Sequence, residues 1–218
     1  MKKSIVVSGG FRNFHLSMAA EELNHKGMLS TFICSAYPTR NISLILDFLR
    51  LSNNKKLNRF LSRKIIVDES SLNSLYFSEL LNYGSVLFNW NEKLKNRFKK
   101  MTVHLYSKRC SSVIKSSICS SAKVYHYRAQ FGGDSVQVAK NNGLIALCDH
   151  SIADPRVIDY LVNNDGELPK NIDEHSISIL EEMMLLDIEQ ADAILVNSHF
   201  VKDTMVYQGY DADKIHVI

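Results

Sequence analysis

The sequence predicts a doubly wound, mostly parallel α/β domain of the Rossmann-like class. Short apolar runs between polar boundaries recur along the chain, as is typical of strands buried on both faces of a parallel sheet. Longer segments with helical periodicity separate these runs, so right-handed crossovers are expected. A chain of 218 residues can bury one full core. We therefore expect one domain over residues 1–218, with about seven strands.

The first elements form a β-α-β unit. We expect a strand over 4–8, a helix over 13–26 and a second strand over 29–34. The pair Gly9 and Gly10 follows the first strand at once, and lets a backbone approach a ligand closely at the carboxyl end of that strand. The surrounding residues match neither G-x-G-x-x-G nor a P-loop. A dinucleotide site is therefore disfavoured, and a plain tight turn is the alternative.

The middle of the chain is expected to be mainly helical. Helical pieces are predicted over 41–64, a short strand over 65–67, and helices over 72–83 and 90–115. In the last helix, apolar residues recur at helical spacing among many lysines, and a basic amphipathic helix of this kind can lie in a membrane interface. Residues 93–115 are therefore a candidate contact with an anionic membrane surface. An ordinary surface helix packed on the sheet is the alternative.

A candidate site lies where the next two strands end. A strand over 123–127 leads into a polar loop with Arg128, and a strand over 144–148 leads into a loop with Asp149 and His150. Both loops are expected at the carboxyl edge of the sheet, where open α/β sheets place their sites. A carboxylate beside a histidine can set its tautomer and charge. In the alternative interpretation, Asp149 caps a turn and His150 is a solvated loop residue.

Two further segments precede the C-terminal part. Residues 156–172 are interpreted as a loop-rich insertion because they contain N-N-D-G and a proline. An acidic helix is expected over 173–189. Its adjacent acids Glu181 and Glu182 point in different directions and are interpreted as solvated.

The C-terminal segment has a strand-helix-strand pattern. The apolar run 193–196 is expected to be a buried strand, Asn197 or Ser198 to cap a helix over 199–208, and 215–218 to begin another strand. The segments ADAILVNSHFVKDT and GYDADKIHVI together resemble the end of the first domain of nucleotide-sugar glycosyltransferases of the GT-B fold. The resemblance is closest to the large retaining family 4.

This resemblance implies the acceptor-side half of a retaining enzyme that uses a nucleotide-diphosphate sugar and a glycan or lipid-linked acceptor. Gly9 and Gly10 would shape the acceptor loop, and His150 would contact the transferred sugar. Asp149 and Arg128 are weaker candidates. The donor-binding domain is expected to lie outside residues 1–218, so this chain alone is expected to be inactive.

Metal and cofactor sites are not expected. Asp211 and Asp213 spell D-x-D, but they lie in a turn before a strand, where an aspartate caps backbone amides. The four cysteines form no C-x-x-C pair, and no G-x-S-x-G elbow is present. No signal peptide is expected, because the apolar run after Lys2 and Lys3 is too short for one, and no apolar run reaches the length of a membrane span. We expect a cytoplasmic protein, with a peripheral place on the inner face of the membrane as a further option.

Charge is distributed unevenly between the two parts of the chain. Residues 1–128 hold 21 Lys and Arg against 7 Asp and Glu, whereas residues 129–218 hold 5 against 16. Such polarity favours a basic surface that faces an anionic partner. Nucleic acid is not expected, because neither an RNA-binding motif nor a zinc-finger spacing occurs. A non-catalytic binding module or split-enzyme partner is the second hypothesis, and an unrelated Rossmann-like oxidoreductase is a third.

Overall fold

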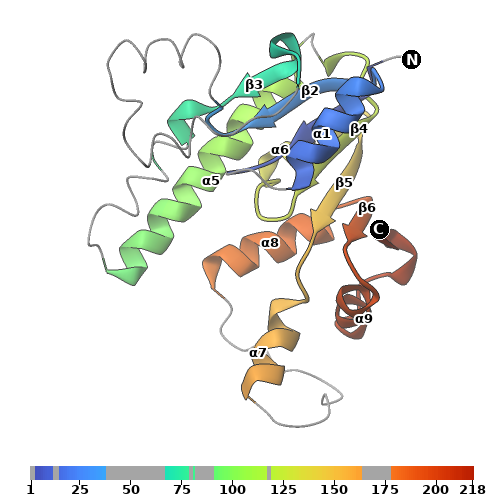
Figure 1. Cartoon of the computed structure of the whole chain (residues 1–218). Helices are drawn as coiled ribbons and strands as arrows, with labels where there is room; N and C mark the ends of the chain where they lie inside the picture. Colours follow the sequence, from blue (N-terminus) through green and yellow to red (C-terminus); the bar gives the residue numbers. More distant parts are fainter. Residues whose placement is uncertain are drawn as a thin grey trace, which may run out of the picture.

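The computed structural model describes residues 3–11, 15–37, 67–78, 81, 91–116, 119–163 and 178–218. Seven strands within these ranges form one sheet, in which every neighbouring pair is parallel. They are β1 (Ile5–Ser8), β2 (Leu29–Cys34), β3 (Leu72–Ser74), β4 (Val124–Arg128), β5 (Ile145–His150), β6 (Ala193–Val196) and β7 (Ile215–Val217). Their order in the sheet is β3-β2-β1-β4-β5-β6-β7 (Figure 1).

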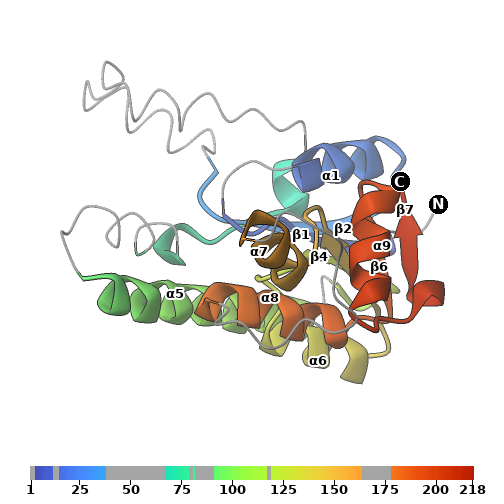
Figure 2. The same cartoon turned by 90° about the horizontal axis from the view of Figure 1, so that it is seen from below.

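Helices cover both faces of this sheet. The described helices are α1 (His15–His25), α5 (Glu92–Ile114), α6 (Asp134–Asn141), α7 (Pro155–Asn163), α8 (Ile179–Glu189) and α9 (His199–Tyr207). Figure 2 shows α1 on one face and α5, α6 and α8 together on the other. The predicted doubly wound α/β class is therefore confirmed, with a fully parallel sheet in the described part.

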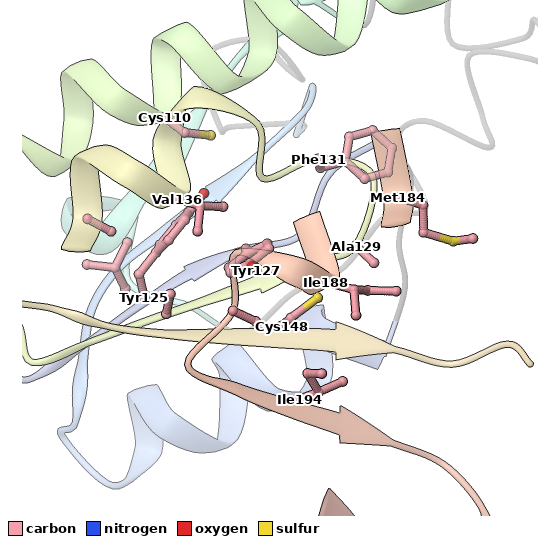
Figure 3. Packing of buried hydrophobic residues seen from close by; sticks show 14 of the residues in the cluster. Cys110, Tyr125, Tyr127, Ala129, Phe131, Val136, Cys148, Met184, Ile188 and Ile194 are labelled. Atoms are coloured by element: carbon pink, nitrogen blue, oxygen red, sulfur yellow. The ribbon is translucent and has the colours of Figure 1, made fainter. Parts of the chain in front are cut away.

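The larger core cluster lies between the sheet and α5, α6 and α8 (Figure 3). Tyr125 and Tyr127 of β4 are fully buried there and stack with ring centroids 5.2 Å apart. The Tyr125 hydroxyl lies 2.8 Å from the Ser135 hydroxyl, and the Tyr127 hydroxyl donates to the carbonyl of Asp187 at 2.7 Å. Both buried hydroxyls are thus satisfied, as burial of polar groups requires. A smaller cluster lies under α1.

Side-chain caps begin several helices. Ser198, one of the two predicted candidates, accepts from the Val201 amide and caps α9. At α8, Ser178 and Glu181 form a capping box, in which the Glu181 carboxylate accepts from the Ser178 amide at 2.7 Å. Glu181 therefore has a structural partner, which the prediction of a solvated acid missed. Asp211 caps a short turn by accepting from the Asp213 amide, as the sequence predicted.

Two predicted elements differ in part from the structure. The helix expected over 72–83 is strand β3 at its start, because Leu72 pairs with Phe32 of β2 and the Leu75 amide continues the ladder to Cys34. Residues 76–78 and 81 are helical, as predicted. The insertion expected to be loop-rich begins with α7, whose first residue is Pro155. Proline suits this position, because the amide of the first residue in a helix has no hydrogen-bond partner within the helix. The predictions for 41–64 and 65–66, and for 164–177, lie outside the described residues.

Every helix in the part that the structure describes is too short or too polar to cross a membrane.

Candidate functional site

The carboxyl ends of β1, β4 and β5 meet at the switch point of the sheet. β1 lies between β2 and β4, and its chain continues to α1 on one face, whereas β4 continues to α6 on the other (Figure 2). Open α/β sheets bind ligands in the crevice at such a point. Gly9 and Gly10 follow β1 here, and Arg128 of β4 pairs in register with Asp149 of β5. The structure therefore brings the predicted site residues to one edge.

Asp149 is the centre of this edge. It is 5% exposed, and its Oδ1 lies 2.6 Å from Nε2 of His15, the first residue of α1. Its Oδ2 lies 3.5 Å from Nε2 of the buried His126. Burial by itself raises the pKa of Asp149, but the hydrogen bonds and charges of His126 and His15 outweigh it and lower that pKa. Asp149 is thus a carboxylate at neutral pH.

This carboxylate fixes the chemistry of His15. An ionised Asp149 selects the tautomer in which Nε2 of His15 carries the donated proton, so Nδ1 is the nitrogen that can take one. The His15 side chain is 45% exposed, whereas that of Asp149 is buried. An exposed imidazole held by a buried carboxylate is the arrangement of a general base with its orienting group.

Neither His15 nor His126 was among the site residues predicted from the sequence. His15 lies just after the glycine turn, at the start of the first helix, which the β-α-β pattern already placed at the carboxyl edge. His126 alternates with Tyr125 and Tyr127 along β4, so it faces the opposite side of the sheet from these two core tyrosines. These positions are the signals that could have found them.

The glycine turn after β1 is held by Tyr106 of α5. The Gly10 amide donates to the Tyr106 hydroxyl at 3.0 Å, and that hydroxyl also contacts Ser8 and donates to the Ile33 carbonyl. Gly10 has φ +70°, a conformation that favours glycine. The amide of Gly9 donates to Ile33 as well. Both amides are used within the protein, so the glycines shape the turn, and their part in acceptor binding stays a prediction.

His150 and Arg128 lie deeper than the sequence suggested. Both were placed in loops, but His150 ends β5 at 2% exposure and Arg128 ends β4 half-buried. Burial lowers the pKa of His150 to about 4, against the opposing charges of Asp154 and Asp149, so the ring is neutral at pH 7. Its Nε2 makes no hydrogen bond to a described residue. The predicted contact with a sugar stays a prediction.

A second glycine turn lies at the start of α6. The amides of Gly132 and Gly133 donate to the Asp187 carboxylate at 2.7 and 2.6 Å. Burial raises the pKa of Asp187 to about 7, although these two hydrogen bonds oppose the rise. A helix start of this kind often binds a phosphate. Here it is already filled by a carboxylate of the same chain.

Within the described ranges, no group of three or more His, Cys, Asp or Glu side chains is arranged to hold a metal ion.

No family model and no curated protein matches this chain. Solved structures do. They include UGT2 of Phytolacca americana complexed with UDP-2fluoro-glucose and pterostilbene, with 11% identity and a TM-score of 0.46 over 100% of this chain and 53% of that one. UDP-GlcNAc 2-epimerase from Methanocaldococcus jannaschii has 12% identity and a TM-score of 0.47, over 100% of this chain and 45% of that one. Medicago truncatula UGT71G1 complexed with UDP-glucose has 11% identity and a TM-score of 0.49, over 99% of this chain and 51% of that one.

The chain thus spans about half the length of the structures it matches. At these identities and TM-scores, the likeness carries no argument about function. The sheet order and the His15–Asp149 pair provide that argument instead.

Proposed function

We propose that this chain is the acceptor-side half of a GT-B glycosyltransferase, which moves a sugar from a nucleotide-diphosphate sugar to a hydroxyl of a glycan or lipid-linked acceptor. The observation that carries the proposal is the pairing of exposed His15 with buried Asp149 at the switch point. The resemblance of 187–218 to the end of a first glycosyltransferase domain supports the same conclusion.

The chemistry needs a base at this place. When the acceptor oxygen bonds to the sugar carbon, the bond from that carbon to the diphosphate breaks and the acceptor hydroxyl loses its proton. Nδ1 of His15 takes this proton, and the Asp149 carboxylate at 2.6 Å stabilises the imidazolium that forms. General base catalysis of this kind contributes roughly a hundredfold or more to the rate.

The stereochemical outcome tests the role of His15. The family 4 resemblance implies retention of the anomeric configuration. A base that takes the acceptor proton favours a single displacement from the face opposite the leaving group, which inverts the configuration. NMR of the product decides between them. Retention supports the family 4 resemblance and removes the base role from His15, whereas inversion supports that role.

The donor diphosphate is expected to be held by a second domain. In the described part of the switch point, the Gly10 amide is bonded to Tyr106 and those of Gly132 and Gly133 to Asp187. Stabilisation of a leaving diphosphate needs other fixed donors. We therefore propose that residues 1–218 alone transfer no sugar, and that they bind nucleotide diphosphates at best in the millimolar range, about −4 kcal/mol.

The test uses a protein that carries both halves. His15→Ala and Asp149→Asn should each lower turnover roughly a hundredfold or more at a temperature where their thermal midpoints show that both variants are folded. His25→Ala is the matched control, because His25 is an exposed histidine at the other end of α1. Full turnover in both site variants would overturn the proposal, as would an equal loss in the control.

A membrane-bound binding module is the second candidate function, and the exposed residues of α5 are the observation that favours it. Leu94 and Met101 are 45% and 44% exposed on this helix, and Lys93, Arg97 and Lys100 are exposed beside them. Apolar side chains among bases suit an anionic bilayer surface. A cytoplasmic, peripheral location of the enzyme agrees with both candidates and is part of the proposal.

A further inference from the structure

We propose that a cavity between β3 and α5 is a binding site for a small amphipathic anion, an acidic group joined to an apolar body. The cavity has a volume of about 550 Å³. Binding sites for small molecules commonly have roughly 300–1,000 Å³. Neither His15 nor Asp149 lines it, so it is separate from the candidate active site.

Two walls form the cavity. One consists of the end of β3 and the residues after it, from Asn73 to Ser78. The other is one stripe of α5, since Leu105, Arg109, Ser112 and Ser116 follow one another at intervals of three or four residues. The cavity is therefore built from two separate elements, β3 with the residues after it and α5.

The charge of the lining favours an anion. Arg109 is the single charged residue among the described residues of the lining, and its side chain is exposed. Among the described residues Arg109 forms no ion pair, so its guanidinium can turn to a ligand. A guanidinium binds a carboxylate or phosphate through two parallel hydrogen bonds. The described part of the lining contains no acidic side chain that would repel such a group.

The remaining lining favours an apolar body. Leu75, Phe77, Leu105 and Val113 line the cavity, and Phe77 is 64% exposed. The hydroxyl of Ser112 already donates to the Lys108 carbonyl. A free phosphate has only five heavy atoms, each comparable to a water molecule of about 30 Å³, so it would leave most of the volume empty.

The test needs only residues 1–218 and does not depend on glycosyl transfer, so it can fail while the proposed function stands. Geranyl phosphate is the probe, titrated below its aggregation range and followed by calorimetry and by amide NMR shifts. We expect submillimolar binding, and binding of inorganic phosphate or geraniol that is at least roughly tenfold weaker.

Two variants and a control locate the site. Arg109→Gln should weaken binding of geranyl phosphate by roughly tenfold or more, since a charge-assisted hydrogen bond is lost. Ser112→Trp should abolish it by filling the cavity. Lys123→Gln, at an exposed base outside both the lining and α5, should leave it unchanged. No binding by the parent chain at millimolar probe, or equal weakening by Lys123→Gln and Arg109→Gln, would overturn the proposal.

Discussion

Gly10→Ala should destabilise this domain more than an ordinary glycine substitution at positive φ. Gly10 has φ +70°, and a Cβ built on it would lie 2.7 Å from a ring carbon of Phe131. Phe131 cannot move away easily, because it is buried and packs edge-on against Phe11 and Tyr106 at 5.1 and 5.8 Å. The methyl group therefore meets a fixed aromatic ring as well as a strained backbone.

The size of the effect follows from these two contributions. A side chain in the left-handed region costs roughly 1–2 kcal/mol. An extra methyl group in a packed core costs typically about 1–3 kcal/mol. The free energy of unfolding should therefore fall by about 2–5 kcal/mol, and the thermal midpoint by about 5–15 °C for a domain of this size.

Gly27→Ala separates the contributions, because Gly27 has φ +64° and nothing within 4 Å of its built Cβ. Only the backbone contribution of roughly 1–2 kcal/mol applies there. Urea and thermal unfolding, followed by circular dichroism, measure both variants. The double variant Gly10→Ala with Phe131→Leu should lose less free energy of unfolding than the sum of the losses of the two single variants. Equal losses for Gly10→Ala and Gly27→Ala would refute the close packing inferred for the turn.

Asp187→Asn should flatten the pH dependence of stability between pH 5 and pH 8. Burial raises the pKa of Asp187 to about 7, so the folded state holds its proton more tightly and stability from this group is lost as pH rises from about 4 to 7. Unfolding of both proteins at the two pH values measures this, and an unchanged difference would contradict it. Replacing Lys93, Arg97 and Lys100 by Glu should weaken binding to vesicles of anionic lipid by about 1 kcal/mol per base. Lys123→Glu, on an exposed base outside α5, is the control for cosedimentation. Absence of binding by the parent at low salt would rule this surface out.

The elements that the sequence predicts well are those whose local pattern agrees with their burial. The strands at 29–34 and 193–196 have the predicted bounds, because each run that the sequence marks as a strand ends at the same residues as the strand in the sheet. Ser198 caps its helix as expected, because the cap involves only residues three positions apart. Such features depend on a few adjacent residues, so one sequence contains the information.

Elements whose structure depends on distant partners were predicted poorly. β3 has three residues and pairs only with β2, so its short pattern looked like the start of a helix. Asp149 and His150 were assigned to a loop because polar residues seldom end a buried strand. Burial of Asp149 is possible because His15 forms a hydrogen bond with it and His126 lies 3.5 Å from its other oxygen. His15 lies 134 positions away, and only the register of the sheet and the packing of α1 bring it there.

In the proposed function, the described switch point separates two tasks, binding of the donor diphosphate and activation of the acceptor. Its two glycine turns have their amides bonded internally, one through Tyr106 and the other through Asp187. A phosphate at either turn would have to displace a buried partner, which leaves a buried polar group unsatisfied at a cost of roughly 1–3 kcal/mol. His15 is different, because its ring is exposed while its orientation is fixed by Asp149. In the proposed function, the group that this domain presents to a reacting molecule is a base for the acceptor, and other residues bind the nucleotide diphosphate.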